Sequence, residues 1–273
     1  MNILIIGKPR ARTSYLGKCL SSNYKLEYLS EPYDPAAYMN ISYQRLKLLK
    51  SKNYENVLYD KQTEWLKGVT KSIFGTDNFV AKLFPRHITV DTSSLENYKF
   101  CDKPDSRYDS IPDPSSYKFK IITNLSEILQ LKKFDKIYFI ERNLIDSPIS
   151  FAYSLRINQF GFSDNNKINE VKKKYSKITL TERDIPFINY VVFEHVLLLK
   201  IKKFIESNYP CTFLTYDNVV NHINSNLNDH LDIDLIDPNF NYKEIITNYS
   251  DIEKHIHQVY DIFYPKLDDV NFI

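Results

Sequence analysis

The sequence predicts an α/β fold in three layers, with a central, mostly parallel sheet and helices on both faces. Short, continuous apolar runs alternate along the chain with segments of helical periodicity. Continuous apolar runs are typical of strands buried on both faces, and their alternation with helices indicates parallel crossover units. The chain has 273 residues, of which 43% are hydrophobic, so it can bury a large core. We expect one domain over residues 1–273, since no linker or internal repeat divides it.

The first part of the chain begins with the clearest strand, Asn2–Ile6, which is almost wholly apolar. Helix Thr13–Leu20 follows. A second strand, Lys25–Leu29, ends before Pro32, because the residue before a proline is restricted and the chain turns there. The remaining elements of this part are two segments of helical periodicity, Ser42–Lys50 and Gln62–Phe74, and a third strand, Phe79–Phe84.

Two polar segments separate the elements of the second part. Residues 101–117 contain three prolines and are predicted to form a loop, long enough to act as a lid or substrate wall. Residues 161–176 are polar and lysine-rich and are expected to be a connection. The longest helical pattern, Asp184–Ser207, carries an apolar stripe that includes His195. The other elements are strands Lys118–Thr123, Lys136–Ile140 and Cys211–Thr215 and helices Leu125–Lys132, Ile145–Leu155 and Ile252–Phe263.

Composition excludes several classes of function. The net charge of +2 argues against a general nucleic-acid coat and against a polybasic membrane binder. The cysteines, Cys19, Cys101 and Cys211, are odd in number and far apart, which indicates a reducing compartment and neither a disulfide framework nor a zinc cluster. No apolar run approaches the about 18 residues of a membrane helix, and the amino terminus does not resemble a signal peptide. We therefore expect a soluble, cytoplasmic protein without nucleic-acid or membrane partners; its oligomeric state does not follow from the residues.

A first motif, GKPRARTS (7–14), joins the first strand to the first helix, which is the context of a phosphate-binding loop. A Walker A loop would carry glycine, lysine and serine or threonine where this chain has Arg12, Thr13 and Ser14, so the phosphate-reaching lysine is missing. The helix amino terminus still favours an anion, and Arg10 and Arg12 can bind it bidentately. The alternative is a basic turn on the surface.

A second motif, RNLIDSPIS (142–150), follows the strand at 136–140. Ser147 is a good N-cap for the helix that follows. Arg142 lies at the carboxyl end of the strand, the edge of an α/β sheet where ligands bind, and Ser150 is in the following helix. These two residues are predicted to hold a second anion. The alternative is a capped helix in which Arg142 pairs with a neighbouring carboxylate.

Together, PRARTSYL (9–16) and RNLIDSPIS (142–150) resemble the PAPS-dependent sulfotransferases, in particular the carbohydrate and bacterial or phage-type members. The resemblance implies a P-loop NTPase-like sulfotransferase fold. It also implies that the first motif holds the 5′-phosphosulfate of 3′-phosphoadenosine 5′-phosphosulfate (PAPS) and that the second holds its 3′-phosphate. The residues carried over are Arg10, Ala11, Arg12, Thr13 and Ser14 for the phosphosulfate, and Arg142 and Ser150 for the 3′-phosphate.

The chain departs from the family pattern at three points. Leu144 replaces the proline common after Arg-Asn, and Arg12 stands where many members have glycine. The Arg-Lys-Gly triplet with which cytosolic members add 3′-phosphate contacts does not occur near the carboxyl terminus. The 3′-phosphate is therefore expected to be held by fewer groups or by other residues.

The chemistry of sulfuryl transfer suits these residues. Charge develops on a bridging phosphate oxygen as it leaves, and fixed arginine, hydroxyl and backbone donors can stabilise it without a metal. We expect Arg10 to serve catalysis in this way, with PAPS as co-substrate and 3′-phosphoadenosine 5′-phosphate (PAP) as product. One alternative is a nucleotide or small-molecule kinase with a degenerate loop, although a kinase normally needs magnesium ligands and the missing lysine. Another is a non-catalytic nucleotide- or glycan-binding protein of the same fold.

The acceptor hydroxyl or amine, on a small molecule or a carbohydrate, requires a general base. Glu31 follows the second strand and resembles the glutamate proposed as base in carbohydrate sulfotransferases, and His87 resembles the catalytic histidine of cytosolic members. The alternatives are a salt-bridged carboxylate and a loop histidine. Lys82 is a further candidate to approach the sulfuryl group, although a strand lysine more often lies at a solvated edge. His195 is expected to be a core histidine with a satisfied hydrogen bond.

Two further pairs resemble family segments. Tyr216-Asp217 resembles a Tyr-Glu/Asp pair and is interpreted as structural. Asn248-Tyr249 resembles a late Asn-Tyr segment that lines the nucleotide site in relatives.

Overall fold

The computed structural model describes most of the predicted elements. The described residues are 1–31, 78–85, 89–91, 121–123, 125–131, 134–159, 165–227, 240–266 and 271–272. The predicted helices Ser42–Lys50 and Gln62–Phe74, the loop 101–117, His87 and Cys101 lie outside the described residues.

The central sheet has five strands, and every described pairing in it is parallel. Its order is β2 (Glu27–Ser30), β3 (Phe79–Leu83), β1 (Asn2–Ile6), β6 (Lys136–Glu141) and β7 (Thr212–Thr215). The predicted mostly parallel sheet is confirmed. Strand β2 begins two residues later than predicted, because Lys25 has left-handed backbone angles (φ 52°, ψ 49°) and closes the preceding helix.

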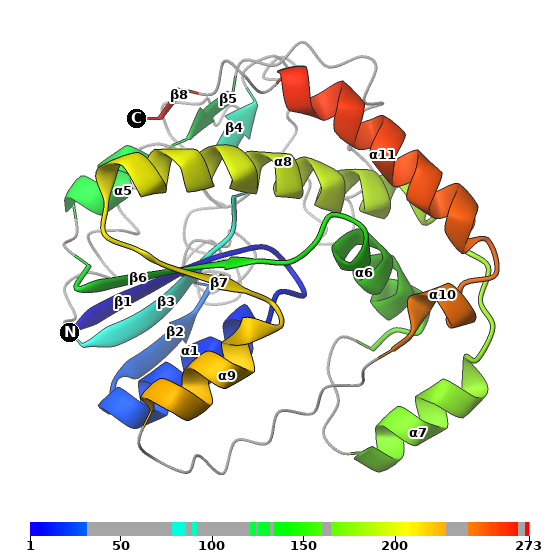
Figure 1. Cartoon of the computed structure of the whole chain (residues 1–273), viewed down its shortest axis with the longest axis horizontal. Helices are drawn as coiled ribbons and strands as arrows, with labels where there is room; N and C mark the ends of the chain where they lie inside the picture. The colour runs from blue at the N-terminus through cyan, green and yellow to red at the C-terminus, as the bar shows by residue number, and fades with distance from the viewer. Residues whose placement is uncertain are drawn as a thin grey trace, which may run out of the picture.

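Helices cover both faces of this sheet (Figure 1). On one face lie α1 (Thr13–Tyr24) and α9 (Asn218–Asn226), and on the other α5 (Leu125–Leu131) and α8 (Ile185–Asn208). Successive residues of β1 point to opposite faces: Ile3 packs in the core with α1 and α9, and Leu4 in the core with α5 and α8. Both faces are therefore buried, as the continuous apolar run predicts, and the three-layer α/β/α architecture is confirmed.

A second helical group lies beyond the carboxyl ends of the strands (Figure 1). It consists of α6 (Asp146–Arg156), α7 (Asn165–Lys174), α10 (Tyr242–Ile245) and α11 (Tyr249–Lys266), which share a hydrophobic core with α8. Helix α7 corrects the predicted connection at 161–176. Val171 packs against this core, Ile168 three residues earlier is buried, and the other residues of α7 are polar, so its apolar pattern is short.

A small second sheet was not predicted. Strands β4 (Thr89–Asp91), β5 (Ile121–Thr123) and β8 (Asn271–Phe272) form it, with β5 in the middle. Strand β5 coincides with the end of the predicted strand Lys118–Thr123, but it pairs outside the central sheet.

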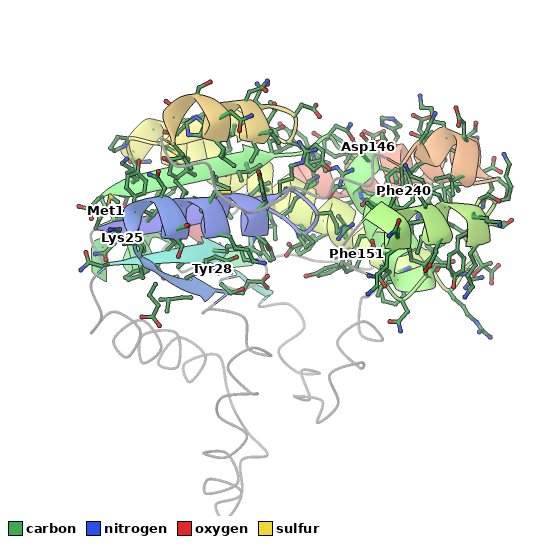
Figure 2. All side chains as sticks on the ribbon, turned by 90° about the horizontal axis from the view of Figure 1, so that it is seen from below. Met1, Lys25, Tyr28, Asp146, Phe151 and Phe240 are labelled. Atoms are coloured by element: carbon green, nitrogen blue, oxygen red, sulfur yellow. The ribbon has the colours of Figure 1, made fainter. Side chains whose placement is uncertain are left out.

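The strand order places a topological switch point between β1 and β6. The chain leaving β1 passes through α1 to β2 on one side, and the chain leaving β6 goes to β7 on the other. In open α/β sheets, ligands bind in the crevice at the carboxyl ends of such strands. Figure 2 shows Met1 and Lys25 at one end of the sheet and Asp146 beyond the opposite end. Both predicted anion motifs follow β1 and β6 directly, so they meet at this edge of the sheet.

Candidate anion-binding site

The two predicted motifs are in direct contact. Nε of Arg10 donates a hydrogen bond to Oγ of Ser150 at 3.3 Å, and Nη1 of Arg142 donates to the carbonyl oxygen of Arg10 at 2.8 Å. Oγ of Ser147 donates to the carbonyl oxygen of Pro9 at 3.2 Å. The loop after β1 and the segment after β6 therefore form one surface.

The loop after β1 has an uncommon backbone. Arg10 and Arg12 have positive φ angles of 66° and 59°, a conformation that glycine adopts far more readily than other residues. Each such residue costs about 1 kcal/mol or more and persists only where the surroundings impose it. Arg12 is the N-cap residue of α1 and makes no side-chain cap. Ala11, between the two arginines, is buried in the core on the α1 face.

Gly7 is required where β1 ends. A Cβ atom there would lie 2.6 Å from Cγ2 of Thr13 and 3.3 Å from the carbonyl oxygen of Ile140. Thr13 is buried at the start of α1, in the position where a Walker A loop has its lysine. Close packing of strand against helix thus fixes the loop in place.

Tyr216 holds the guanidinium groups of both motifs. The centroid of its ring lies 3.8 Å from Cζ of Arg12 and 4.3 Å from Cζ of Arg142. Nη1 of Arg12 also donates to the Tyr216 carbonyl oxygen at 2.8 Å. A ring face attracts cations, so Tyr216 offsets the repulsion between two arginines. The interpretation of Tyr216 as structural is thereby sharpened: it orders the cationic groups of the site.

Ser150 joins three elements. Besides the bond from Arg10, its Oγ receives a hydrogen bond from the hydroxyl of Tyr242 in α10 at 3.0 Å. A serine oxygen has two acceptor positions and one proton to donate. With Arg10 and Tyr242 both donating, the Ser150 hydroxyl can still donate its own proton to a third group, and its side chain is buried. No sequence motif marks Tyr242, since the contact depends on the packing of α10 against α6.

The start of α6 differs from the prediction. The helix begins at Asp146, and Oδ1 of Asn143 accepts a hydrogen bond from the Asp146 backbone N–H at 2.6 Å. The N-cap residue is Ile145, which makes no side-chain cap, and the Asn143 side chain accepts from the first N–H of the helix. Ser147, the predicted N-cap, is buried and bonded to the loop instead. The predicted alternative, in which Arg142 pairs with a neighbouring carboxylate, gives way to its contacts with Arg10 and Tyr216.

Lys82 connects the candidate base to the loop. Its Nζ lies 2.7 Å from Oγ of Ser14 and 2.8 Å from Oε1 of Glu31. The Lys82 side chain is 3% exposed, because β3 lies between β2 and β1, so the expectation of a solvated edge lysine is wrong. Glu31 follows β2, and its side chain is 23% exposed.

A buried basic pair underlies the loop. Nζ of Lys8 lies 2.7 Å from Nδ1 of His195 in α8 and donates to the carbonyl oxygen of Asn143 at 3.3 Å. Burial is the main cause that lowers the pKa of Lys8 to about 7 and the pKa of His195 to about 3. The prediction of a buried, hydrogen-bonded His195 is confirmed, but its partner is the second residue of the phosphate-loop motif, 187 residues away.

The late Asn-Tyr segment has structural contacts. The Asn248 side chain accepts from the backbone N–H of Leu180 at 3.1 Å and donates to the Leu180 carbonyl oxygen at 2.8 Å. Tyr249 packs in the core shared by α6, α8 and α11. These contacts fix the chain after α10.

Three properties hold for the described residues. Cys19 and Cys211 are free thiols. Among these residues no three histidine, cysteine, aspartate or glutamate side chains are grouped as a metal site would require. Within the same residues, no helix combines the length and apolar composition needed to cross a membrane.

Comparison with known proteins adds little to this site. No family model matches the chain. No curated protein matches it either. Among solved structures, a deoxyadenosine kinase from M. mycoides with bound dCTP is similar at 16% identity and a TM-score of 0.37, over 82% of this chain and 100% of that one. A likeness this distant carries no argument about function.

Proposed function

We propose that this chain is a group transferase with a nucleotide donor, and that it transfers the sulfuryl group of PAPS to a hydroxyl or amine of a small-molecule or carbohydrate acceptor. The observation that carries the proposal is the contact between Arg10 and Ser150. It joins the segment that resembles a phosphosulfate loop to the segment that resembles a 3′-phosphate site, at a switch point of the sheet.

The donor would lie across both segments. Arg10, Arg12 and the first turn of α1, with Thr13 and Ser14, would hold the phosphosulfate. Arg142 and Ser150 would hold the 3′-phosphate. These groups are held by the fold before a ligand arrives, which is the condition for strong electrostatic stabilisation of developing charge.

Glu31 would act as the general base. In the transfer step, the acceptor oxygen or nitrogen forms a bond to sulfur while the bond between sulfur and the bridging phosphate oxygen breaks. The acceptor proton passes to Glu31, and the electron pair of the broken bond stays on PAP, where Arg10 stabilises it. Lys82, which contacts Glu31 and Ser14, would keep the base beside the phosphosulfate. His87 remains the second candidate base.

Transfer assays test the reaction class. The protein is incubated with radiolabelled PAPS and a panel of alcohols, amines and carbohydrates, and in parallel with radiolabelled ATP and magnesium. Sulfuryl transfer to one acceptor class is the expected result. Phosphoryl transfer from ATP alone would show that the chain is a kinase. Binding of PAP without transfer, unchanged by Glu31→Gln or His87→Ala, would show a non-catalytic nucleotide-binding protein.

A further inference from the structure

We propose that Lys8 is a further positioning residue of this anion site, and that its ammonium form ties the loop after β1 to the segment after β6, so that anion binding is accompanied by proton uptake at the Lys8–His195 pair. The inference rests on the proposed anion site but not on the identity of the nucleotide.

Lys8 connects the loop after β1 to two other segments of the chain. Its side chain is fully buried and leaves the loop on the α8 side of the sheet. Its ammonium contacts the carbonyl oxygen of Asn143, in the segment that also carries Arg142. It also contacts Nδ1 of His195 in α8. An ammonium donates to both acceptors at once, whereas a neutral amine donates more weakly. The charged form is therefore the form that holds the two segments together.

Lys8 and His195 cannot both be positively charged. Nζ and Nδ1 lie 2.7 Å apart in a buried place, where two adjacent cations would repel strongly. When Lys8 is charged, His195 must be neutral and accept at Nδ1, which leaves its proton on Nε2. The pKa of His195 is lowered to about 3, so Lys8 is the member of the pair that changes charge near neutral pH.

The surroundings of Lys8 act on its pKa in opposite directions. Burial and the Arg142 guanidinium lower its pKa, whereas three carboxylates raise it: Glu141 from β6, Glu194 from α8 and Asp146 from α6. Arg142 already acts electrostatically on Lys8, so an anion that neutralises Arg142 favours the ammonium form of Lys8.

The sign of the pH dependence follows. Below about pH 7 Lys8 is already charged in the free protein, and binding takes up no proton. Above that pH the free protein carries neutral Lys8, and binding must supply the proton. Anion affinity therefore falls as the pH rises above the pKa of Lys8 in the free protein, by at most about tenfold per pH unit.

Titration calorimetry at about pH 8, in two buffers of different ionisation enthalpy, measures the proton uptake. PAP and inorganic sulfate are the two probes, and sulfate has no proton of its own to exchange in this range. The expected result is an uptake approaching one proton per anion for both probes. Lys8→Met should bind more weakly at neutral pH and show no uptake, whereas Lys136→Met, at the opposite end of β6, should behave as the wild type.

The outcomes separate the two proposals. Sulfate binding with uptake and no PAP binding would support the role of Lys8 and overturn the PAPS proposal. PAP binding without uptake in the wild-type protein would overturn the role of Lys8 and leave the PAPS proposal standing. Uptake that persists in Lys8→Met would also overturn it. Absence of binding by both probes would contradict both proposals.

Discussion

The guanidinium of Arg10 donates a hydrogen bond to Oγ of Ser150 at 3.3 Å, although 140 residues separate them in the chain. The bond crosses from the loop after β1 to helix α6. Because Arg142 also donates to the Arg10 carbonyl oxygen, the main chain and the side chain of one arginine both fix the junction. A ligand at this junction would therefore meet groups from both segments at once.

The hydroxyl of Tyr242 supports this junction, so Tyr242→Phe should weaken the binding of PAP by about fivefold to tenfold, the value of one neutral hydrogen bond. Binding of AMP, which lacks a 3′-phosphate, should be nearly unchanged. Titration calorimetry on Tyr242→Phe, Ser150→Ala and the double variant measures the coupling. The control is Tyr249→Phe, since Tyr249 is buried in the same hydrophobic core as Tyr242. Strictly additive effects would contradict a role of Tyr242 through Ser150.

The ring of Tyr216 should matter more than its hydroxyl. Tyr216→Leu removes the ring face against which Arg12 and Arg142 lie. We expect it to weaken AMP binding by about 0.5–2 kcal/mol and PAP binding by more, because only PAP carries the 3′-phosphate assigned to Arg142. Tyr216→Phe keeps the ring and should bind as the wild type does. Dissociation constants for both nucleotides measure this, and equal losses in the Leu and Phe variants would count against guanidinium stacking.

Glu31 and Lys82 should affect turnover differently. Glu31→Gln should lower kcat for the acceptor by about 10²–10⁴-fold and leave the dissociation constant of PAP unchanged, because the carboxylate takes the acceptor proton. Lys82→Met should lower kcat and also weaken the binding of PAPS, since Lys82 contacts Ser14 of the loop as well as Glu31. Steady-state kinetics with radiolabelled PAPS separate the two effects. Unaltered turnover in Glu31→Gln would transfer the role of base to His87.

His195 makes stability depend on pH. Its pKa falls from 6.5 to about 3 on folding, so the unfolded chain binds a proton in this interval that the folded chain does not. The free energy of unfolding should therefore decrease on acidification through the interval, by up to about 1.4 kcal/mol per pH unit from this group. His195→Gln keeps an acceptor for Lys8 and removes the titration. Denaturant unfolding between about pH 3 and pH 6.5 measures this dependence. If the free energy of unfolding changed with pH equally in His195→Gln and in the wild type, His195 would not be its source.

The sequence predicts the buried framework well, because apolar periodicity is a local signal. Strand Asn2–Ile6 has the predicted limits, helix α8 contains the predicted apolar stripe, and helix α11 contains the predicted helix Ile252–Phe263. Helix α7 has a weak apolar pattern, since its only apolar residues are Ile168, which is buried, and Val171, which packs against the core. The second sheet joins β5 to β8, near the carboxyl terminus, and strands of two or three residues carry almost no periodic signal.

The site is predictable only in part, because the sequence signals are local and several of its contacts are between distant segments. Both anion motifs are continuous in sequence, and the parallel sheet implies that they meet. The partners that shape them are remote: Tyr216 and Tyr242 come from other segments, and His195 reaches the loop from α8. Burial of Lys82 follows from the position of β3 inside the sheet, which strand periodicity does not give.

The most direct measurement is the ratio of the dissociation constants for AMP and PAP, by titration calorimetry, in the wild-type protein and in Arg142→Ala. If Arg142 and Ser150 hold a 3′-phosphate, PAP binds at least about tenfold more tightly than AMP, as a charge-assisted hydrogen bond is worth about 1.5–3 kcal/mol. The preference should disappear in Arg142→Ala and persist in Arg156→Ala. Arg156 ends helix α6, and its Nη1 lies 3.9 Å from Oδ2 of Asp184, so it is a control arginine outside the proposed site. Equal affinities for AMP and PAP in the wild-type protein would contradict the assignment of the 3′-phosphate site.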